Sequence, residues 1–301
     1  MNRLLTLAVS FMISLTLYSH NFNLGKSDKA AILMVHFGTT FDDTRKLTID
    51  ALNEEVRSAF PDFAVYEAFT SRIVIKRLAA RGVEKITPQE ALLRLAADGY
   101  THVVVQSSNI IDGVEMSVLR REVEQMKPFF KEIRVGTPLL YSVDDCIAVA
   151  DIMASRHADA LRSSKVALVL VGHGTEGPAT AIYSQIDYML TSAGYPNAHV
   201  ATVEGYPTYD TTLARLKSLK TREVTLVPFM FVAGDHARND IDVEWRENLE
   251  KEGFKVSTVI EGLGSIQAIR AMFVERIKAA LEGRHPDAVE QKSRAISNAG
   301  L

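Results

Sequence analysis

The stretch that decides the fold is ALVLVGHGT, which spans residues 167–175. Its first five residues are apolar and run directly into a Gly-His-Gly-Thr turn, and such a run predicts a strand buried on both faces of a parallel sheet. The glycines beside His173 let the chain turn sharply and leave the imidazole uncrowded. The carboxyl end of such a strand is where open α/β sheets bind ligands. His173 is therefore either a functional residue or a core histidine next to a turn.

Similar apolar runs recur along the chain and alternate with stretches that have helical periodicity. Strands are predicted near residues 30–37, 63–68, 102–107, 133–137, 167–171, 199–203, 224–229 and 256–260. Strands that alternate with helices predict right-handed crossovers and parallel sheets, so the fold class is α/β.

Shifted comparison of the sequence with itself indicates an internal repeat. A shift of 136 residues places Phe37 on His173, and a shift of 121 residues places Glu115 on His236. We therefore expect two similar three-layer α/β halves, residues 30–141 and 142–283, each with a mainly four-stranded parallel sheet. Strand ends from both halves would face each other across a cleft, and the second half would carry a metal site.

The two ends of the chain differ from the rest. Arg3 precedes an apolar run from Leu4 to Leu17, which has the length of a signal-peptide core and is short for a membrane span. We expect residues 1–29 to be an export signal or an uncleaved anchor followed by a polar linker, which predicts a periplasmic or cell-envelope location. Residues 284–301 are polar and mixed, which predicts a disordered tail.

Composition excludes several functions. The net charge of −3, without a basic arm or zinc knuckle, argues against nucleic acid as a partner. Cys146 is the single cysteine, so a disulfide within the chain and a cysteine-cluster metal site are excluded. No strand is followed by the glycine pattern of a dinucleotide site. Any metal must be held by histidine and carboxylate.

Three residues at predicted strand ends of the second half form such a set: His173, Glu204 and His236. Two imidazoles and a carboxylate suit Co²⁺, Fe²⁺, Ni²⁺ or Zn²⁺, and a neutral imidazole can also accept a proton. Glu115 could supply a carboxylate from the first half, or could simply stabilise the start of a helix. His36 is out of phase with His173 in the repeat, and we interpret it as structural.

These residues resemble a known family. The segments Gly172–Thr175, Val203–Pro207 and Phe231–Ala237, together with Phe37–Thr40 and Ala68–Arg72, are similar to the anaerobic, CbiK-type cobalt chelatases among the class II chelatases. The resemblance covers about residues 30–281. It implies ATP-independent insertion of Co²⁺ into sirohydrochlorin or a related tetrapyrrole during cobalamin biosynthesis. It further implies that His173, Glu204 and His236 bind the metal and accept protons, with Glu115 on the opposite wall.

An exported, oligomeric form that also binds haem belongs to the same family, so the resemblance implies a homo-oligomer and a possible haem. The sequence departs from the family pattern at Asn109, at Val114 and at Glu176, which follows the Gly-His-Gly-Thr turn. These departures and the export signal leave a second function open, a cell-envelope carrier of haem or another metallotetrapyrrole without catalysis. A histidine-phosphatase-like enzyme ranks low, because Gly172 stands where that chemistry usually has arginine.

Overall fold

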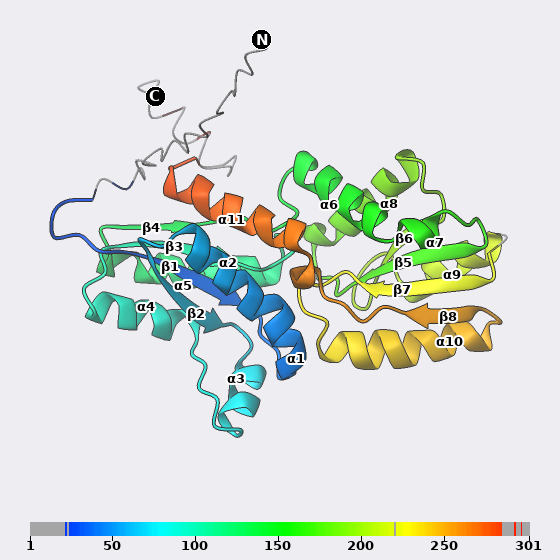
Figure 1. Ribbon diagram of the computed structural model, residues 1–301, viewed down its shortest axis with the longest axis horizontal. Coiled ribbons are helices and arrows are strands. Elements are labelled where there is room, and N and C mark those ends of the chain that lie inside the picture. The colour runs from blue at the N-terminus through cyan, green and yellow to red at the C-terminus, as the bar shows by residue number, and fades with distance from the viewer. Residues whose placement is uncertain (1–21, 23, 220, 285–291, 293–295, 297–301) are drawn as a thin grey trace, which may run out of the picture.

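The computed structural model describes residues 22, 24–219, 221–284, 292 and 296, which form two parallel sheets of four strands (Figure 1). The first sheet has the order β2-β1-β3-β4, and the second has the order β6-β5-β7-β8. The strands are β1 (Ala30–His36), β2 (Ala64–Phe69), β3 (His102–Ser107), β4 (Glu132–Val135), β5 (Val166–Gly172), β6 (Ala198–Thr202), β7 (Glu223–Pro228) and β8 (Lys255–Thr258). The predicted α/β class and all eight predicted strands are confirmed.

The two sheets repeat one another in detail. Strands β1 and β5 each contain seven residues and lie between equivalent neighbours in their sheets. Each is followed, after one residue, by a glycine with positive φ: +98° at Gly38 and +89° at Gly174. The shift of 136 residues read from the sequence is therefore the register of the structural repeat.

Helices cover both faces of each sheet and connect the parallel strands (Figure 1). In the first half the connections are α1 (Asp42–Arg45), the π-helical turn η1 (Lys46–Asp50), α2 (Ala51–Ala59), α3 (Arg72–Ala79), α4 (Pro88–Ala97), α5 (Val114–Met126) and η2 (Lys127–Phe129). In the rest of the chain they are α6 (Val143–Arg156), α7 (Ala158–Leu161), η3 (Pro178–Thr180), α8 (Ala181–Ser192), α9 (Tyr209–Ser218), η4 (Ala237–Trp245), α10 (Arg246–Lys251), η5 (Leu263–Ser265) and α11 (Gln267–Leu281).

Successive side chains along each strand point to opposite faces of the sheet, and the buried ones form three hydrophobic clusters. Leu33 and Val35 face a cluster under α4 and α5, whereas Val169 and Val171 face a cluster under η4 and α10. The residues between them, such as Met34 and Leu170, belong to one cluster that is continuous through both halves. Burial on both faces is why these strands read as unbroken apolar runs.

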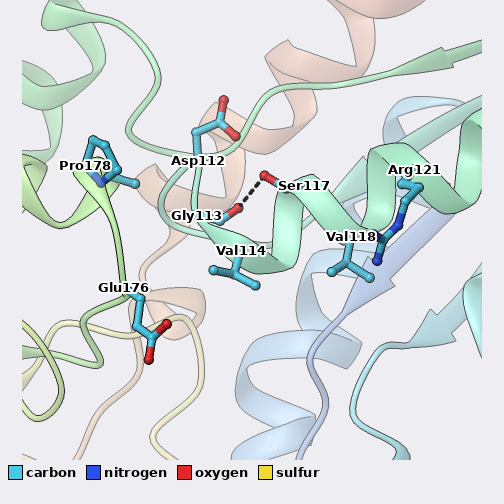
Figure 2. A pocket seen from close by; sticks show the side chains of 9 residues that line it. Asp112, Gly113, Val114, Ser117, Val118, Arg121, Glu176 and Pro178 are labelled. Carbon is cyan, nitrogen blue, oxygen red and sulfur yellow. Dashed lines mark hydrogen bonds between the residues drawn. The ribbon is translucent and has the colours of Figure 1, made fainter.

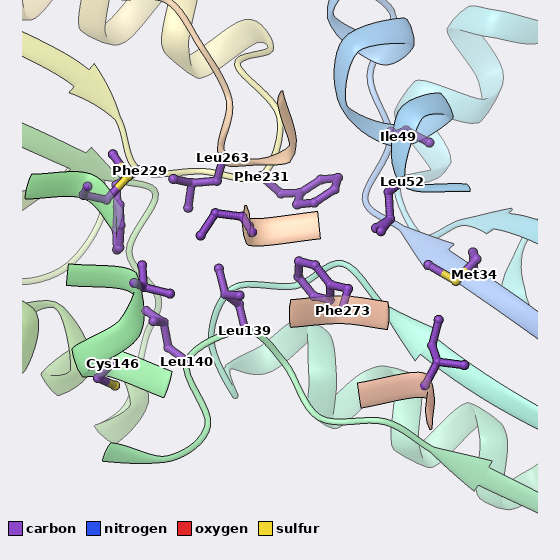
Figure 3. Packing of buried hydrophobic residues seen from close by; sticks show 14 of the residues in the cluster. Met34, Ile49, Leu52, Leu139, Leu140, Cys146, Phe229, Phe231, Leu263 and Phe273 are labelled. Carbon is purple, nitrogen blue, oxygen red and sulfur yellow. The ribbon is translucent and has the colours of Figure 1, made fainter. Parts of the chain in front are cut away.

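The last helix joins the two halves. Helix α11 lies in sequence within the predicted second half, residues 142–283, but it packs against α2, β3 and β4 of the first (Figure 1). Phe273 on α11 is buried beside Phe231 at a ring distance of 5.5 Å, in the shared core drawn in Figure 3. The division at residue 141 therefore separates the sheets but not the helices that cover them.

Part of the predicted linker belongs to the folded body. Phe22 is buried and packs its ring against His102 at 5.0 Å and under the Arg134 guanidinium at 4.3 Å. Asp28 binds Lys131 at 2.7 Å, and this hydrogen bond, together with one from the Gly25 N–H, lowers the pKa of Asp28 to about 2. The predicted export signal and nearly all of the predicted tail lie outside the described residues. Within the described part of the chain, no helix combines the length and apolar character that crossing a membrane requires.

Candidate active site

The turn after β5 is held against the turn after β6. The Glu204 N–H donates to the His173 carbonyl at 2.7 Å, which brings the two strand ends together. A Cβ on Gly174 would lie 1.4 Å from the Glu204 carbonyl oxygen, so only glycine permits this approach. Gly172 is needed in the same way, because a Cβ there would lie 2.2 Å from the ring of Tyr183. These glycines position the His173 side chain at the sheet edge.

His173 and His236 come from different strand ends and meet. Their ring centroids are 4.6 Å apart with the rings perpendicular, and both side chains are partly exposed. His236 has helical backbone angles and lies immediately before η4. The start of η4 has no side-chain cap, and the Asp235 carboxylate just before it accepts from the Asn239 side chain at 3.0 Å. The sheet and the start of η4 therefore set the geometry of the imidazole pair.

Hydrogen bonds assign the same tautomer to both rings. The Nδ1 of His236 lies 2.6 Å from Asp240 Oδ2, and the Nδ1 of His173 lies 3.1 Å from the Gly174 carbonyl oxygen. Carboxylate and carbonyl oxygens only accept, so each Nδ1 carries the proton. Each Nε2 then has a free lone pair, which can bind a metal ion or accept a proton. The carboxylate behind His236 has the orienting role found behind metal-binding histidines.

Glu204 contacts His173 through its backbone N–H, and its side chain is exposed. Among the described residues, no three histidine, cysteine or acidic side chains are grouped closely enough to hold a metal ion. The arrangement thus brings two of the predicted ligands side by side, with the third on the adjoining turn. The role of Glu204 as a metal ligand stays a prediction.

Glu115 lies in the first turn of α5, at the carboxyl end of the first sheet. Its carboxylate accepts a hydrogen bond from Thr70 Oγ1 at 3.1 Å. The start of α5 touches the second half, since a Cβ on Gly113 would lie 3.1 Å from Thr175 Oγ1. Glu115 thus lies at the start of α5, where the first half approaches the second, while its place on a cleft wall and its catalytic role stay predictions from the family resemblance.

A cavity of about 520 Å³ lies where these two walls meet (Figure 2). One side is formed by α5 and the residues before it, and the other by the segment after the Gly-His-Gly-Thr turn. Its lining consists of Asp112, Gly113, Val114, Ser117, Val118, Arg121, Glu176, Pro178 and Ala179. The volume is within the range of sites that hold small molecules, roughly 300–1,000 Å³. The two histidines are outside this lining, although Glu176 follows His173 by three residues.

Among the basic residues near the site, two already have acidic partners. Arg120 forms a two-point ion pair with Asp112 at 2.6 and 2.9 Å, and Arg238 binds Asp43 at 2.8 Å. Arg121 instead lines the cavity with its side chain exposed (Figure 2). Sequence alone could not separate Arg120 from Arg121, because only the rotation of α5 decides which one faces the cavity.

His36 is confirmed as structural. It is fully buried, with Nδ1 2.9 Å from Ser108 Oγ and Nε2 3.0 Å from Asn53 Oδ1, and burial lowers its pKa. Asp240 is the functional candidate that sequence reasoning missed. The signal was available in its spacing, because a residue four positions after His236 lies on the same helical face.

Solved structures with the same architecture are chelatases. SirB from Bacillus subtilis with Fe³⁺ has a TM-score of 0.60 at 16% identity, covering 84% of this chain and 96% of that one. SirB from Bacillus subtilis subspecies spizizenii in complex with cobalt has a TM-score of 0.59 at 15% identity, covering 85% and 96%. The fold is that of the class II chelatases.

Sequence comparison is more specific. The family model described as cobalt chelatase (CbiK) matches residues 30–282. The sirohydrochlorin cobaltochelatase of Salmonella typhimurium is 37% identical over 258 residues, which cover 84% of this chain and 97% of that protein. Sirohydrochlorin cobaltochelatase CbiKC of Nitratidesulfovibrio vulgaris is 32% identical, covering 84% and 91%. The chain belongs to the CbiK family of cobalt chelatases.

Proposed function

We propose that this protein inserts Co²⁺ into sirohydrochlorin, without ATP, in the cleft where the carboxyl edges of the two sheets meet. The observation that carries the proposal is the imidazole pair of His173 and His236, 4.6 Å apart and each with Nδ1 already bonded. Two relatives, of which nearly the whole length is matched, are named sirohydrochlorin cobaltochelatase. The metal is a substrate here, so the site must bind it and then release it.

The second half would bind the incoming metal. The Nε2 atoms of His173 and His236 would be the donors, and the exposed carboxylate of Glu204, on the adjoining turn, would have to turn toward them to join. Imidazole and carboxylate bind all three of Fe²⁺, Co²⁺ and Ni²⁺, with affinity that generally rises in this order, so this ligand set alone does not select Co²⁺. Open coordination positions allow the pyrrole nitrogens to replace the protein ligands.

The reaction also requires a base. Two pyrrole N–H protons leave as the metal–nitrogen bonds form, so one divalent ion enters and two protons depart. Protons displaced toward the first half would meet Glu115, whose exposed carboxylate can take a proton and pass it to water. Protons displaced toward the metal side would meet the imidazole pair. The choice between these acceptors follows from which face of the macrocycle the metal approaches.

The acidic side chains of the macrocycle need cationic partners. Of Arg120, Arg121 and Arg238, Arg121 is the best placed, because its side chain is exposed on the cavity wall. Arg120 and Arg238 would first have to leave Asp112 and Asp43. We therefore assign Arg121 to bind a substrate carboxylate.

The test is to mix the purified protein with sirohydrochlorin and Co²⁺, Fe²⁺ or Ni²⁺ in turn and follow the visible absorption spectrum. The proposal predicts conversion to the metal complex with many turnovers per protein when Co²⁺ is supplied. Tight binding of the tetrapyrrole with no turnover for any metal would overturn it and favour the carrier function instead. Haem binding and oligomeric state remain predictions from the family and are measured separately by pigment content and sedimentation.

A further inference from the structure

The first half exposes apolar side chains where its strands end. Phe37 follows β1 and is 48% exposed, Ile73 lies in the first turn of α3 after β2 and is 66% exposed, and Val114 starts α5 after β3 and is 54% exposed. These three strands are neighbours in the sheet order β2-β1-β3. Single exposed apolar residues are ordinary, but one after each of three adjacent strands puts apolar side chains along one edge of the sheet.

Contacts around Phe37 direct this edge toward the second half. The Ser71 N–H donates to the Phe37 carbonyl at 3.2 Å, and the adjacent Thr70 side chain binds Glu115. On the other side, a Cβ on Gly234 would lie 3.5 Å from Thr39 Oγ1. Phe37 therefore lies between the residues that hold Glu115 and the loop that leads to His236.

Phe37 also has a defined counterpart. In the repeat it occupies the position of His173, since both follow a seven-residue central strand and precede a glycine with positive φ. An imidazole stands at this position in one half and an exposed phenyl ring in the other. The same backbone therefore presents a metal ligand on one wall and an apolar face on the other.

We infer that Phe37 and Val114, which follow the neighbouring strands β1 and β3, form the wall on which one face of the tetrapyrrole packs while the metal arrives from the imidazole pair on the other side. The inference rests on the proposed function and adds a positioning surface to it. The face of a conjugated macrocycle is flat and apolar, and aromatic and aliphatic side chains bind such faces by dispersion and water exclusion. Val114 belongs to the cavity lining, and Phe37 follows the strand next to the one that leads to Val114.

The experiment compares Phe37→Ala with Phe129→Ala as a matched control. Phe129 is an equally exposed phenylalanine of the same half, 57% exposed, but it follows α5 at the amino edge of the sheet, where Lys131 N–H binds the Thr101 carbonyl just before β3. Sirohydrochlorin binding is measured without metal by absorbance titration, and kcat and the KM values for tetrapyrrole and Co²⁺ are then measured separately.

Phe37→Ala should raise the Kd and KM for sirohydrochlorin about tenfold and leave the KM for Co²⁺ unchanged. Phe37→Trp should restore binding, whereas Phe129→Ala should change none of these values. If the wild-type protein metallates sirohydrochlorin and Phe37→Ala keeps its Kd for sirohydrochlorin within twofold of the wild-type value, this inference is overturned and the proposed function stays intact. A wild-type protein that neither binds nor metallates sirohydrochlorin would overturn both.

Discussion

The two halves of the molecule share a backbone and differ in what their strand ends carry. Both sheets have the same order of four parallel strands, and β1 and β5 are each followed, after one residue, by a glycine with positive φ. The second half presents His173 and His236 at that edge, whereas the first presents Phe37, Val114 and Glu115. The two halves share the backbone of the repeat, and under the proposed function the residues at a few equivalent positions decide which half binds the metal.

His36 and His173 lie one position apart in the repeat, and their surroundings differ. His36 precedes Phe37 by one residue, and a shift of one position in a strand sends the side chain to the other face. His36 is consequently buried between Ser108 and Asn53, with its ring stacked on Phe231 at 6.2 Å. The imidazole of His36 is therefore part of the core, whereas the imidazole of His173, one position later in the repeat, is partly exposed beside His236.

Among substitutions that test the difference between the two halves, Gly174→Ala should have the largest effect on the rate of cobalt insertion. The added Cβ would meet the Glu204 carbonyl at 1.4 Å and force the ends of β5 and β6 apart. Displacement of catalytic groups by about 1 Å can cost about a hundredfold in rate, so we expect at least that loss in the rate of cobalt insertion. Gly253→Ala is the control, because it has a similar φ of +88° but no atom within 4 Å of the added Cβ. Equal rates in the two variants would contradict the account.

Asp240→Ala should have the next largest effect. The substitution removes the carboxylate that holds His236 Nδ1 at 2.6 Å, so the ring loses its fixed tautomer and orientation. Loss of such a partner typically costs about 10- to 100-fold in metal affinity or activity, and the KM for Co²⁺ measures it. Glu244→Ala, an exposed acid in the same helix, should leave the KM unchanged. A normal KM for Co²⁺ in Asp240→Ala would show that His236 needs no support.

Arg121→Ala tests the proposed substrate-binding wall and should have a smaller effect. An exposed cation that binds one carboxylate contributes up to about 1 kcal/mol, so the KM for sirohydrochlorin should rise roughly threefold to fivefold with kcat nearly unchanged. The difference from wild type should shrink as salt is added, because salt screens exposed charges. Arg222→Ala, an exposed arginine distant in sequence from the cavity lining, is the control. An unchanged KM at low salt would remove Arg121 from the site.

The buried histidine of the first half should make stability depend on pH. Burial lowers the pKa of His36 below its unfolded value of about 6.5, so below that pH the unfolded chain binds the proton more readily. The free energy of unfolding should therefore fall as the pH drops from 7.5 to 5, by up to about 1.4 kcal/mol per pH unit from this group. Urea unfolding of wild type and His36→Asn at both pH values checks this. The variant should show the smaller pH dependence, and an identical dependence would refute the assignment.

Much of this fold could be predicted from the sequence because its strands are buried on both faces. Such strands appear as continuous apolar runs like Ala167–Val171, and the repeat then follows from their spacing. The placement of α11 could not be predicted, because an apolar helix face indicates burial without saying which sheet it covers. Phe22 was hidden in a polar segment for a similar reason, since its partners His102 and Arg134 are remote in sequence.

The site could be predicted only as a set of residue types. The sequence placed His173, Glu204 and His236 at strand ends, and the structure brings the two imidazoles together. The tautomers depend on Asp240 and on the Gly174 carbonyl, and the cavity-facing arginine depends on the rotation of α5. Such details depend on how side chains are oriented within elements that the sequence did predict, so they could not be predicted from the sequence.

The most direct measurement is the rate of cobalt insertion into sirohydrochlorin by His173→Ala and His236→Ala, followed by absorbance beside His157→Ala as the control histidine. We expect each of the first two variants to lose at least about a hundredfold in rate while still binding the tetrapyrrole, and the control to remain active. Undiminished insertion by either variant would contradict the claim that the paired imidazoles of the second half deliver the metal.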